Sequence, residues 1–254
     1  GFYPADGDAR PGRWDSVNFM ASDRGANVLE HVEIVGAYRG LHAHFSRLSG
    51  IDVRISRAWR GVQFQESEVE LGEVRISSSS SAIRCRVSNV RIEGIRVEDT
   101  VSGGNFFRSA VTLRRVGTDR TGWYGFRFRD SRVTFSGGRV SGSLTGVSVQ
   151  EGDARLDGVR IAGTGLAGAA VQDGDVKMTG CHVTGGFLDG LSAANGSVSV
   201  TGGEIAGFGR HAVKLTGPAR VTLRGVSLPA SGGGGAARFL DGKTVPGLGV
   251  VRVE

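Results

Sequence analysis

Cysteine, lysine and long apolar runs are scarce in this chain, and each shortage excludes a class of protein. The two cysteines among 254 residues provide no disulfide framework, and metal-ligand spacing such as Cys-x-x-Cys is absent. No segment approaches the ~18 apolar residues of a membrane-spanning helix, and no signal-peptide pattern is present. No helical periodicity persists beyond a few residues. The sequence therefore predicts a strand-rich protein with no metal, no cofactor and no transmembrane segment.

Glycine, in contrast, is abundant and regularly placed. It provides 43 of the 254 residues, well above the ~7% of average proteins, and it recurs at fixed places in a repeat. Eight segments of 21 or 22 residues align almost without gaps, and a ninth precedes them. The nine segments are 26–46, 47–67, 68–88, 89–109, 110–131, 132–152, 153–174, 175–196 and 197–218. A fixed period of this length indicates one structural unit stacked on copies of itself.

Each repeat contains three short apolar patterns with the period of a strand. The apolar residues of segment 153–174 come in pairs spaced by two: Ala154/Leu156, Val159/Ile161 and Ala169/Val171. This spacing is expected for strands with one buried face, and glycine or a short polar turn separates the pairs. One such coil cannot bury its apolar face alone. The coils must therefore stack in parallel, ~4.8 Å apart, with their inward side chains in continuous columns.

This pattern resembles the right-handed parallel β-helix of the pectate-lyase-like superfamily over nearly the whole chain. The resemblance implies an all-β, single-stranded right-handed β-solenoid of about 10–11 coils of 21–22 residues, with three short strands per coil. Near the start, Trp14, Val17 and Phe19 align with a third strand. They resemble the W-x-x-I-x-F coil of bacterial secreted and surface β-helix proteins, although Ser16 stands where glycine is usual. The implied localisation is extracellular, cell-surface or periplasmic.

We expect residues 1–254 to form a single β-helix domain with irregular ends. Residues 1–25 would form a partial first coil, 26–218 the regular coils, and 219–254 an irregular C-terminal coil. In that last part Gly232–Gly235 would lengthen a corner, and Val250–Val253 would form a last strand. Because the sequence starts in the middle of a coil, we expect a fragment of a longer chain. Missing sequence or a partner would then cover the open edge of the first coil.

The two cysteines occupy inward positions about five coils apart, Cys85 on a third strand and Cys181 on a second. The strand spacing separates them by roughly 24 Å, whereas a disulfide requires Cα atoms within ~7 Å of each other. Both are interpreted as small core residues.

Arginine provides 28 of the 31 basic Lys and Arg side chains, and the net charge is +6. The outward positions of the third strands form a polar, locally basic surface. Its candidate ligand-binding residues are His42, His44, Arg84, Arg86, Arg127 and Arg129. A second ladder, on the middle strands, contains Arg54, Arg75, Arg96, Arg139 and Arg160, followed by His182.

Like charges stacked ~5 Å apart repel one another and need anionic partners. One interpretation is that nearby acidic residues provide them in ion pairs between coils. The other is that the third-strand surface is a groove for an acidic polymer such as an anionic polysaccharide, held by arginine forks. Nucleic acid is not expected as a partner, because the sequence has no basic tail and no stacking-platform motif.

Aromatic residues recur at one corner of the repeat, together with two leucines. They are Tyr38, Trp59, Trp123, Tyr124, Phe187 and Phe208, interleaved with Leu144 and Leu166. An inward corner stack is expected, because the position stays apolar in most coils. Trp59 and Tyr124 are the exceptions: each lies beside a polar position of the groove, so both are candidates for contact with a sugar ring.

Enzymes of the resembled superfamily act in a groove on one face of the stack, and this implies a cluster of acid, base and cation. One such cluster can be assembled: Asp189 and His211 occupy equivalent positions in successive coils, and Lys214 is close in sequence. A second carboxylate is missing, because Ala167 and Thr145 occupy the same column. The Asp-Pro-His-Asp strand associated with mannuronan epimerases is also absent. A structural Asp189–His211 pair is the alternative.

Three functions are consistent with these observations. The first is a non-catalytic surface or periplasmic β-helix that acts as a scaffold, or as an adhesion or assembly module in a larger envelope assembly. The second is binding of an anionic polysaccharide along the third-strand arginines. The third is a polysaccharide lyase or glycoside hydrolase that acts on an acidic glycan through Asp189, His211 and Lys214.

Overall fold

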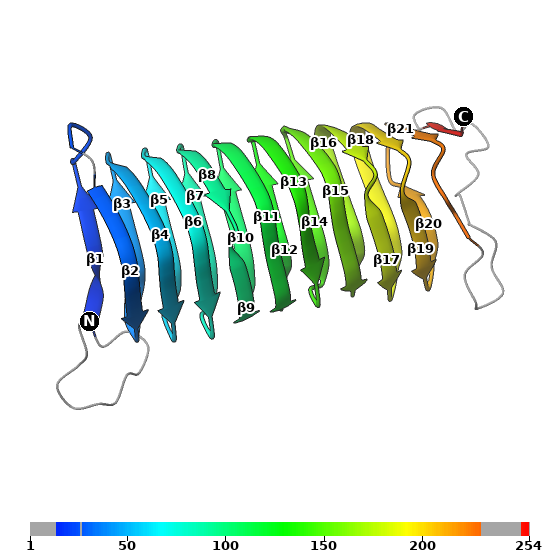
Figure 1. The fold of residues 1–254 in the computed structure, drawn as a ribbon. Coiled ribbons are helices and arrows are strands. Elements are labelled where there is room, and N and C mark those ends of the chain that lie inside the picture. Colours follow the sequence, from blue (N-terminus) through cyan, green and yellow to red (C-terminus); the bar gives the residue numbers. More distant parts are fainter. Residues whose placement is uncertain (1–13, 26, 230–249, 254) are drawn as a thin grey trace.

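The protein is described by a computed structural model that covers residues 14–25, 27–229 and 250–253. Within these residues the chain is all-β: 22 strands form one all-parallel sheet, and no helix is present. The sheet winds into a stack of about 10 coils, with β1 and β22 at opposite ends of the stack (Figure 1). The predicted parallel β-helix is therefore confirmed.

The strands follow one another around the coils in chain order. They are β1 (Trp14–Met20), β2 (Asn27–Val35), β3 (Ala37–His44), β4 (Arg47–Ser56), β5 (Arg60–Gln65), β6 (Glu68–Ser77), β7 (Ser81–Arg86), β8 (Asn89–Glu93), β9 (Arg96–Thr100), β10 (Ser102–Phe107), β11 (Ala110–Thr121), β12 (Tyr124–Arg129), β13 (Arg132–Ser141), β14 (Thr145–Gln150), β15 (Asp153–Thr164), β16 (Ala167–Thr179), β17 (His182–Gly186), β18 (Asp189–Thr201), β19 (Glu204–Phe208), β20 (His211–Leu215), β21 (Ala219–Arg224) and β22 (Val250–Val253).

Strands pair with strands one coil away, in the register that the repeat predicts. Ile76 in β6 pairs with Val97 in β9, 21 residues later. Ile161 in β15 pairs with Val183 in β17, 22 residues later. Residues at equal positions of successive repeats therefore lie directly above one another, and a column of side chains can be read from the sequence.

Each coil has three edges, which are the straight segments formed by the first, second and third strands of the repeat. Single residues with a left-handed backbone conformation join these edges. β15 contains both the first and the second edge of its coil and bends at Gly158, where φ is 62°. Because pairing continues through such bends, neighbouring edges fuse into strands of up to 13 residues, as in β16. At other corners a residue other than glycine adopts this left-handed conformation, as Val87 does with φ of 52°. A β-branched residue is strained there, because its Cβ crowds the backbone.

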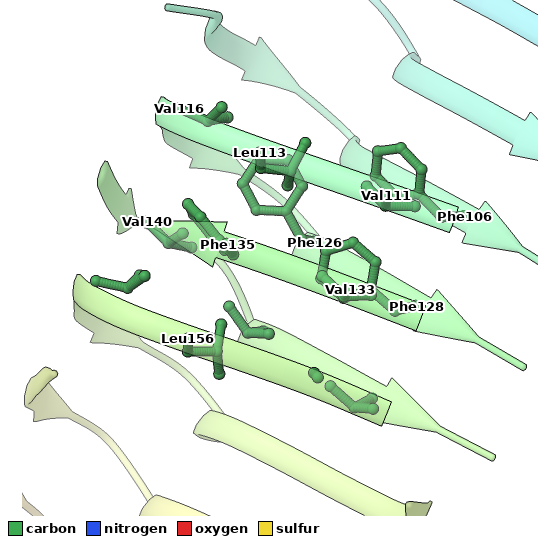
Figure 2. Close-up of a cluster of buried hydrophobic side chains, with 14 of the residues drawn as sticks. Phe106, Val111, Leu113, Val116, Phe126, Phe128, Val133, Phe135, Val140 and Leu156 are labelled. Carbon is green, nitrogen blue, oxygen red and sulfur yellow. The ribbon is translucent and has the colours of Figure 1, made fainter. Parts of the chain in front are cut away.

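The core is a stack of inward columns rather than a ball. Phe106, Phe126, Phe128 and Phe135 are fully buried near its middle (Figure 2). The rings of Phe106 and Phe128 stack with centroids 5.2 Å apart, and Phe126 meets Phe135 edge-to-face at 5.4 Å. Gly104 leaves room for this cluster, because a Cβ there would lie 2.6 Å from the Phe126 ring. Such pairs stabilise the core beyond the burial of their area alone.

A ladder of serines runs along the corner between the third edge and the next coil. Its buried members are Ser46, Ser67, Ser88, Ser109 and Ser131. From Ser67 onward, each hydroxyl accepts a hydrogen bond from the backbone N–H of the preceding serine in the ladder, at 3.1–3.3 Å. Each hydroxyl also donates to the carbonyl two residues before it. The ladder therefore satisfies backbone groups that the buried turn would otherwise leave unpaired.

A strand lies at each end of the described stack. Val17 and Phe19 in β1 pair with the third edge of the next coil, after a bulge beside Ser16. At the other end β22 pairs with β21 as a last strand. Residues 1–13 of the expected partial coil, and the lengthened corner expected at Gly232–Gly235, lie outside the described residues. Both cysteines are free and buried, as predicted.

Candidate anion-binding face

The outward side chains of the third edge form one continuous surface, which we name the third-edge face. It is built by β3, β5, β7, β10, β12, β14, β16, β18 and β20. One outward column contains His42, Gln63, Arg84, Asn105, Arg127, Ser148, Ala170, Ser192 and Lys214. The other contains His44, Gln65, Arg86, Phe107, Arg129, Gln150, Gln172 and Ala194. Among the predicted arginines, Arg84 and Arg86 lie on one coil and Arg127 and Arg129 lie two coils later. The coil between them carries Asn105 and Phe107.

Phe107 lies at the centre of this arginine cluster. The guanidinium carbons of Arg108, Arg129 and Arg86 lie 5.0, 5.2 and 5.9 Å from its ring centroid. Cations at this distance are attracted by the negative face of an aromatic ring. Phe107 is not among the predicted site residues. The signal in the sequence is a single aromatic residue in an outward column of mostly polar residues.

The cationic groups of this cluster find few anionic partners. Arg84 makes no ion pair or hydrogen bond within the described part of the chain, and Arg127 donates to the neutral Gln150 Oε1 at 2.8 Å. The Nε of Arg129 is buried and has no hydrogen-bond partner among the described residues. Arg108 is the exception, with its Nε 2.9 Å from Asp130 Oδ2. The cluster therefore retains unmet hydrogen-bond donors and unpaired positive charge, which an anionic ligand could satisfy.

His42 and His44 extend the two columns toward the N-terminal end. His42 is buried, and its Nδ1 lies 2.8 Å from Asn18 Oδ1. Burial is the largest cause that lowers the pKa of His42, followed by repulsion from Arg39. The ring of His44 stacks on Phe45 with centroids 4.1 Å apart, while its Nε2 is 3.9 Å from Glu66. His42 is thus held neutral by its surroundings and adds little to the positive charge of the face.

The corner residues do not stack inward, which corrects the expectation from the sequence. Tyr38, Trp59, Trp123, Leu166 and Phe187 are between 39% and 77% exposed. They form an apolar strip along the border of the third-edge face. Trp59 is therefore available for contact with a ligand, as predicted for this residue.

The inward position of that corner is filled by small residues one or two places earlier in the chain. Ala58 and Thr121 are examples, at 1% and 0% exposure. Phe208 is the one aromatic residue of the set that is buried, because it pairs with Gly186 and so belongs to the inward column. Tyr124 lies within the face itself, half-buried, with the Arg127 guanidinium 5.1 Å from its ring centroid.

The predicted Asp189–His211–Lys214 cluster is present at the C-terminal end of the same face. Asp189 in β18 pairs in register with His211 in β20, and its Oδ1 lies 2.7 Å from His211 Nδ1. Lys214 Nζ lies 3.5 Å from the other carboxylate oxygen, Oδ2. Asp189 is 4% exposed, so these two contacts offset the cost of burying its negative charge. The carboxylate fixes the imidazole through Nδ1 and leaves Nε2 for other contacts.

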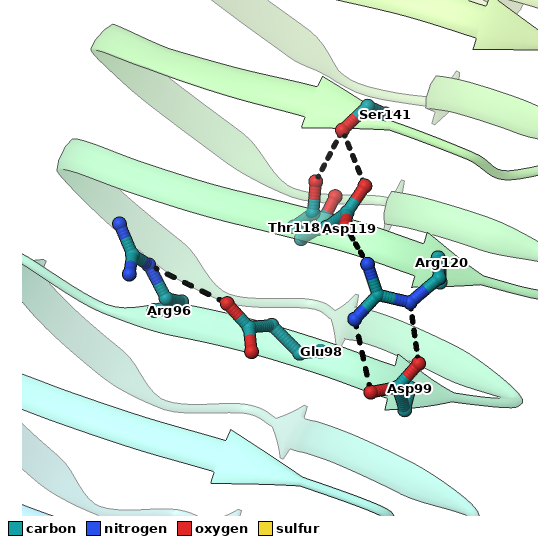
Figure 3. Close-up of polar contacts among 7 residues, drawn as sticks. All are labelled: Arg96, Glu98, Asp99, Thr118, Asp119, Arg120 and Ser141. Atoms are coloured by element: carbon teal, nitrogen blue, oxygen red, sulfur yellow. Dashed lines mark hydrogen bonds and ion pairs between the residues drawn. The ribbon is translucent and has the colours of Figure 1, made fainter.

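Ion pairs between coils neutralise part of the remaining charge, as one interpretation of the sequence predicted. Figure 3 shows one such pair, between Arg120 and Asp99 of the preceding coil. It also shows two pairs within a coil, Arg120 with Asp119 and Arg96 with Glu98, the latter at 3.6 Å. The hydrogen bond from Arg120 Nε, 2.6 Å from Asp99 Oδ1, lowers the pKa of that carboxyl group. These pairs lie on the second edge and its corners. On the third edge Arg39 pairs with Asp15 at 2.8 Å, whereas Arg84, Arg86, Arg127 and Arg129 have no carboxylate partner among the described residues.

Neither a metal centre nor a membrane-spanning helix is found where the structure is described. No group of three or more His, Cys, Asp or Glu side chains is arranged to hold a metal ion in residues 14–25, 27–229 and 250–253. Over the same residues, no helix is long and apolar enough to cross a bilayer.

The fold defines the chain as a parallel β-helix, and solved structures of similar fold include a periplasmic alginate epimerase. One mutant of this epimerase, AlgG, matches with a TM-score of 0.55 and 14% identity, over 77% of this chain and 56% of that chain. A second AlgG mutant matches with a TM-score of 0.53 and 13% identity, over 85% of this chain and 73% of that chain. This chain thus spans little more than half of the first AlgG structure.

Bacteriophage CBA120 tailspike protein 3 matches over 94% of this chain and 49% of that chain, at 10% identity. Its TM-score of 0.38 is too low to carry an argument. No known protein family and no curated protein matches the sequence. At these identities the similarity to the solved structures shows the fold alone.

Proposed function

We propose that this chain is a non-catalytic β-helix module of the cell envelope or the extracellular space that binds an anionic polysaccharide on its third-edge face. The observation that carries the proposal is the arginine cluster around Phe107. Arg84, Arg86, Arg127 and Arg129 lie in register on nearby coils, and none of them pairs with a carboxylate among the described residues. Repelling cations on a rigid stack are stabilised when a ligand supplies the missing anions.

The form of the surface supports a polymeric ligand. The two outward columns run along the long axis of the stack, so charged groups repeat at the ~4.8 Å spacing of the coils. The exposed Trp59 and Trp123 border the face and provide flat apolar surfaces for sugar rings. The similar fold of a periplasmic alginate epimerase agrees with a polysaccharide ligand and an envelope location. A larger envelope assembly as partner is part of the same proposal.

Binding of uronate oligosaccharides at low and high salt tests this function. We expect binding to oligouronates and not to neutral oligosaccharides of equal length, and a steep loss of affinity as salt screens the ionic contacts. Arg84→Gln and Arg129→Gln should each weaken binding about five- to tenfold. Arg132→Gln, on the first edge in β13, removes the same charge from an exposed position and should leave affinity unchanged. Equal losses in all three variants would reduce the effect to net charge and reject a specific face.

The Asp189–His211–Lys214 cluster supports a second candidate function, a lyase or glycoside hydrolase acting on an acidic glycan. The specific observation is a buried carboxylate that orients the imidazole of His211 at 2.7 Å, with a lysine beside it. In this arrangement His211 Nε2 would exchange a proton with the sugar while Lys214 holds the uronate carboxylate.

Assays for reducing ends and unsaturated products on acidic polysaccharides distinguish this activity from simple binding. Asp189→Asn keeps the size of the side chain and should remove most of the turnover while the protein remains folded by circular dichroism. Wild-type protein without turnover, or unchanged turnover in the variant, would leave Asp189–His211 as a structural pair.

A further inference from the structure

A gap interrupts the arginine ladder of the second edge, away from the third-edge face. Arg75 pairs in register with Arg96, and Arg139 pairs with Arg160. Between these two pairs the ladder position is occupied by Gly117, which pairs with Arg96 on one side and Arg139 on the other. Two coil spacings, about 10 Å, therefore separate the backbones of Arg96 and Arg139.

The gap is open space within a surface groove that these four arginines line together with Gly117. A Cβ at Gly117 would find its nearest neighbours at 3.8 and 4.0 Å, both backbone oxygens. Gly117 does not have a left-handed φ, so the backbone would accept a side chain there. The absence of a side chain is therefore required neither by packing nor by backbone conformation.

Charge in the groove is unbalanced, because five arginines line it against the two carboxylates of Asp52 and Glu73. Arg75, Arg139 and Arg160 make no ion pair and no hydrogen bond within the described residues, and all three are exposed. Arg96 is 3.6 Å from Glu98, a loose contact. Arg115, which also lines the groove, pairs with Glu93 at 2.7 Å. Four guanidinium groups thus flank one empty ladder position, and the groove keeps an excess of positive charge.

We propose that the gap at Gly117 is a binding site for a phosphate group, free or carried as a monoester. The guanidinium groups of Arg96 and Arg139 can approach the gap from opposite sides along the ladder. A phosphate presents a charge near −2 and three free acceptor oxygens, enough to receive a planar fork from each side. A carboxylate presents one charge and two oxygens and cannot satisfy both forks as fully. The site is on a different edge from the third-edge face and does not depend on its function.

Titration with inorganic phosphate, glucose 6-phosphate and glucuronate, followed by calorimetry at low salt, tests the site. We expect both phosphates to bind and glucuronate to bind at least tenfold more weakly here. Arg139→Gln should weaken phosphate binding about tenfold, because one charge-assisted hydrogen-bond donor is lost. Arg132→Gln removes the same charge from an exposed position of the first edge and should leave phosphate binding unchanged. A stronger response to the sugar ester than to the free ion identifies a phosphorylated glycan as the source. Equal responses identify phosphate itself.

Two substitutions at Gly117 provide an independent readout that needs no ligand. Gly117→Glu places a carboxylate in the gap, so it should abolish phosphate binding and raise the Tm. Gly117→Gln adds nearly the same volume without charge, and it controls for the loss of glycine flexibility. We expect the Tm of the Glu variant to be about 1–3 °C higher than that of the Gln variant at low salt, and this difference in Tm to shrink at high salt.

Failure of wild-type protein to bind either phosphate at low salt would overturn the proposal. Equal phosphate binding in wild-type and Gly117→Glu protein, or equal Tm values for the Glu and Gln variants at low salt, would also do so. Loss of uronate binding in Arg84→Gln with intact phosphate binding would show that the two sites are separate.

Discussion

The serine ladder leads to a stability prediction whose size can be worked out from its hydrogen bonds. Ser88→Ala removes a hydroxyl that accepts from Ser67 N–H at 3.2 Å and donates to Arg86 O at 2.9 Å. The Arg86 carbonyl retains a second donor, Glu66 N–H at 3.0 Å. Ser67 N–H has no such substitute among the described hydrogen bonds, and Ser67 is buried. The cost is therefore that of one unsatisfied buried donor, about 1–2 kcal/mol.

For a domain of this size, that cost corresponds to a fall in Tm of about 3–6 °C. Urea unfolding should show a lower midpoint with an unchanged slope, because the surface exposed on unfolding stays the same. Ser199→Ala is the matched control: Ser199 lies at a half-buried outward position of β18, and its hydroxyl makes no hydrogen bond within the described residues. If Ser88→Ala costs no more than Ser199→Ala, the ladder does not stabilise the fold.

Three further predictions concern single residues. Val87→Asn should raise the free energy of unfolding by about 1 kcal/mol, because asparagine tolerates the φ of 52° that strains valine; an unchanged urea midpoint would contradict this. Burial and Arg39 lower the pKa of His42, so its contribution to stability is full above the unfolded pKa of ~6.5 and is lost as pH falls through the folded pKa. His42→Gln should therefore lose less stability than wild type between pH 7.5 and 5, and equal losses would show that His42 does not titrate in this way. Burial raises the pKa of both the Cys85 and Cys181 thiols, so a thiol reagent should label them at the rate of unfolding; fast labelling of folded protein would show an open core.

The columns of the β-helix could be predicted from the sequence because one rule governs every coil. Side chains alternate with a period of two, and the repeat of 21 or 22 residues places Ile76 under Val97. The same rule predicts that Asp189 lies next to His211, as the register shows. A contact between outward residues of adjacent strands follows from register alone, since the strand spacing brings paired side chains close together.

The corners could not be predicted in the same way. A single left-handed residue reverses the direction of the side chains that follow, and its position is not fixed by the apolar pattern. Trp59 and Phe208 both look like corner aromatics in the sequence. They differ by one position, so Trp59 is half-exposed while Phe208 is buried. In the cluster around Phe107, register predicts the neighbours Arg86 and Arg129, whereas Arg108 comes from a turn and could not be placed there from the sequence.

The arginine cluster and the Asp189–His211–Lys214 cluster lie along one outward column of the third-edge face. Their separation therefore tests whether a bound polysaccharide runs along the axis of the stack. Lys214 lies in the same outward column as Arg84 and Arg127, four coils beyond Arg127. That separation is about 19 Å at the spacing of the coils. The positions between them carry the small residues Ser148, Ala170 and Ser192, so no bulky side chain of this column blocks the way.

A polysaccharide that runs along the stack would therefore contact both ends, whereas one that crosses the coils would contact the arginine cluster alone. In the first case Lys214→Gln should weaken the binding of long oligouronates about fivefold and leave short ones unaffected, because only the long chains span the path. Arg84→Gln should weaken both. If Lys214→Gln has the same effect at every chain length, or none at any length, a ligand lying along the axis is excluded. The arginine cluster would then act as an isolated site.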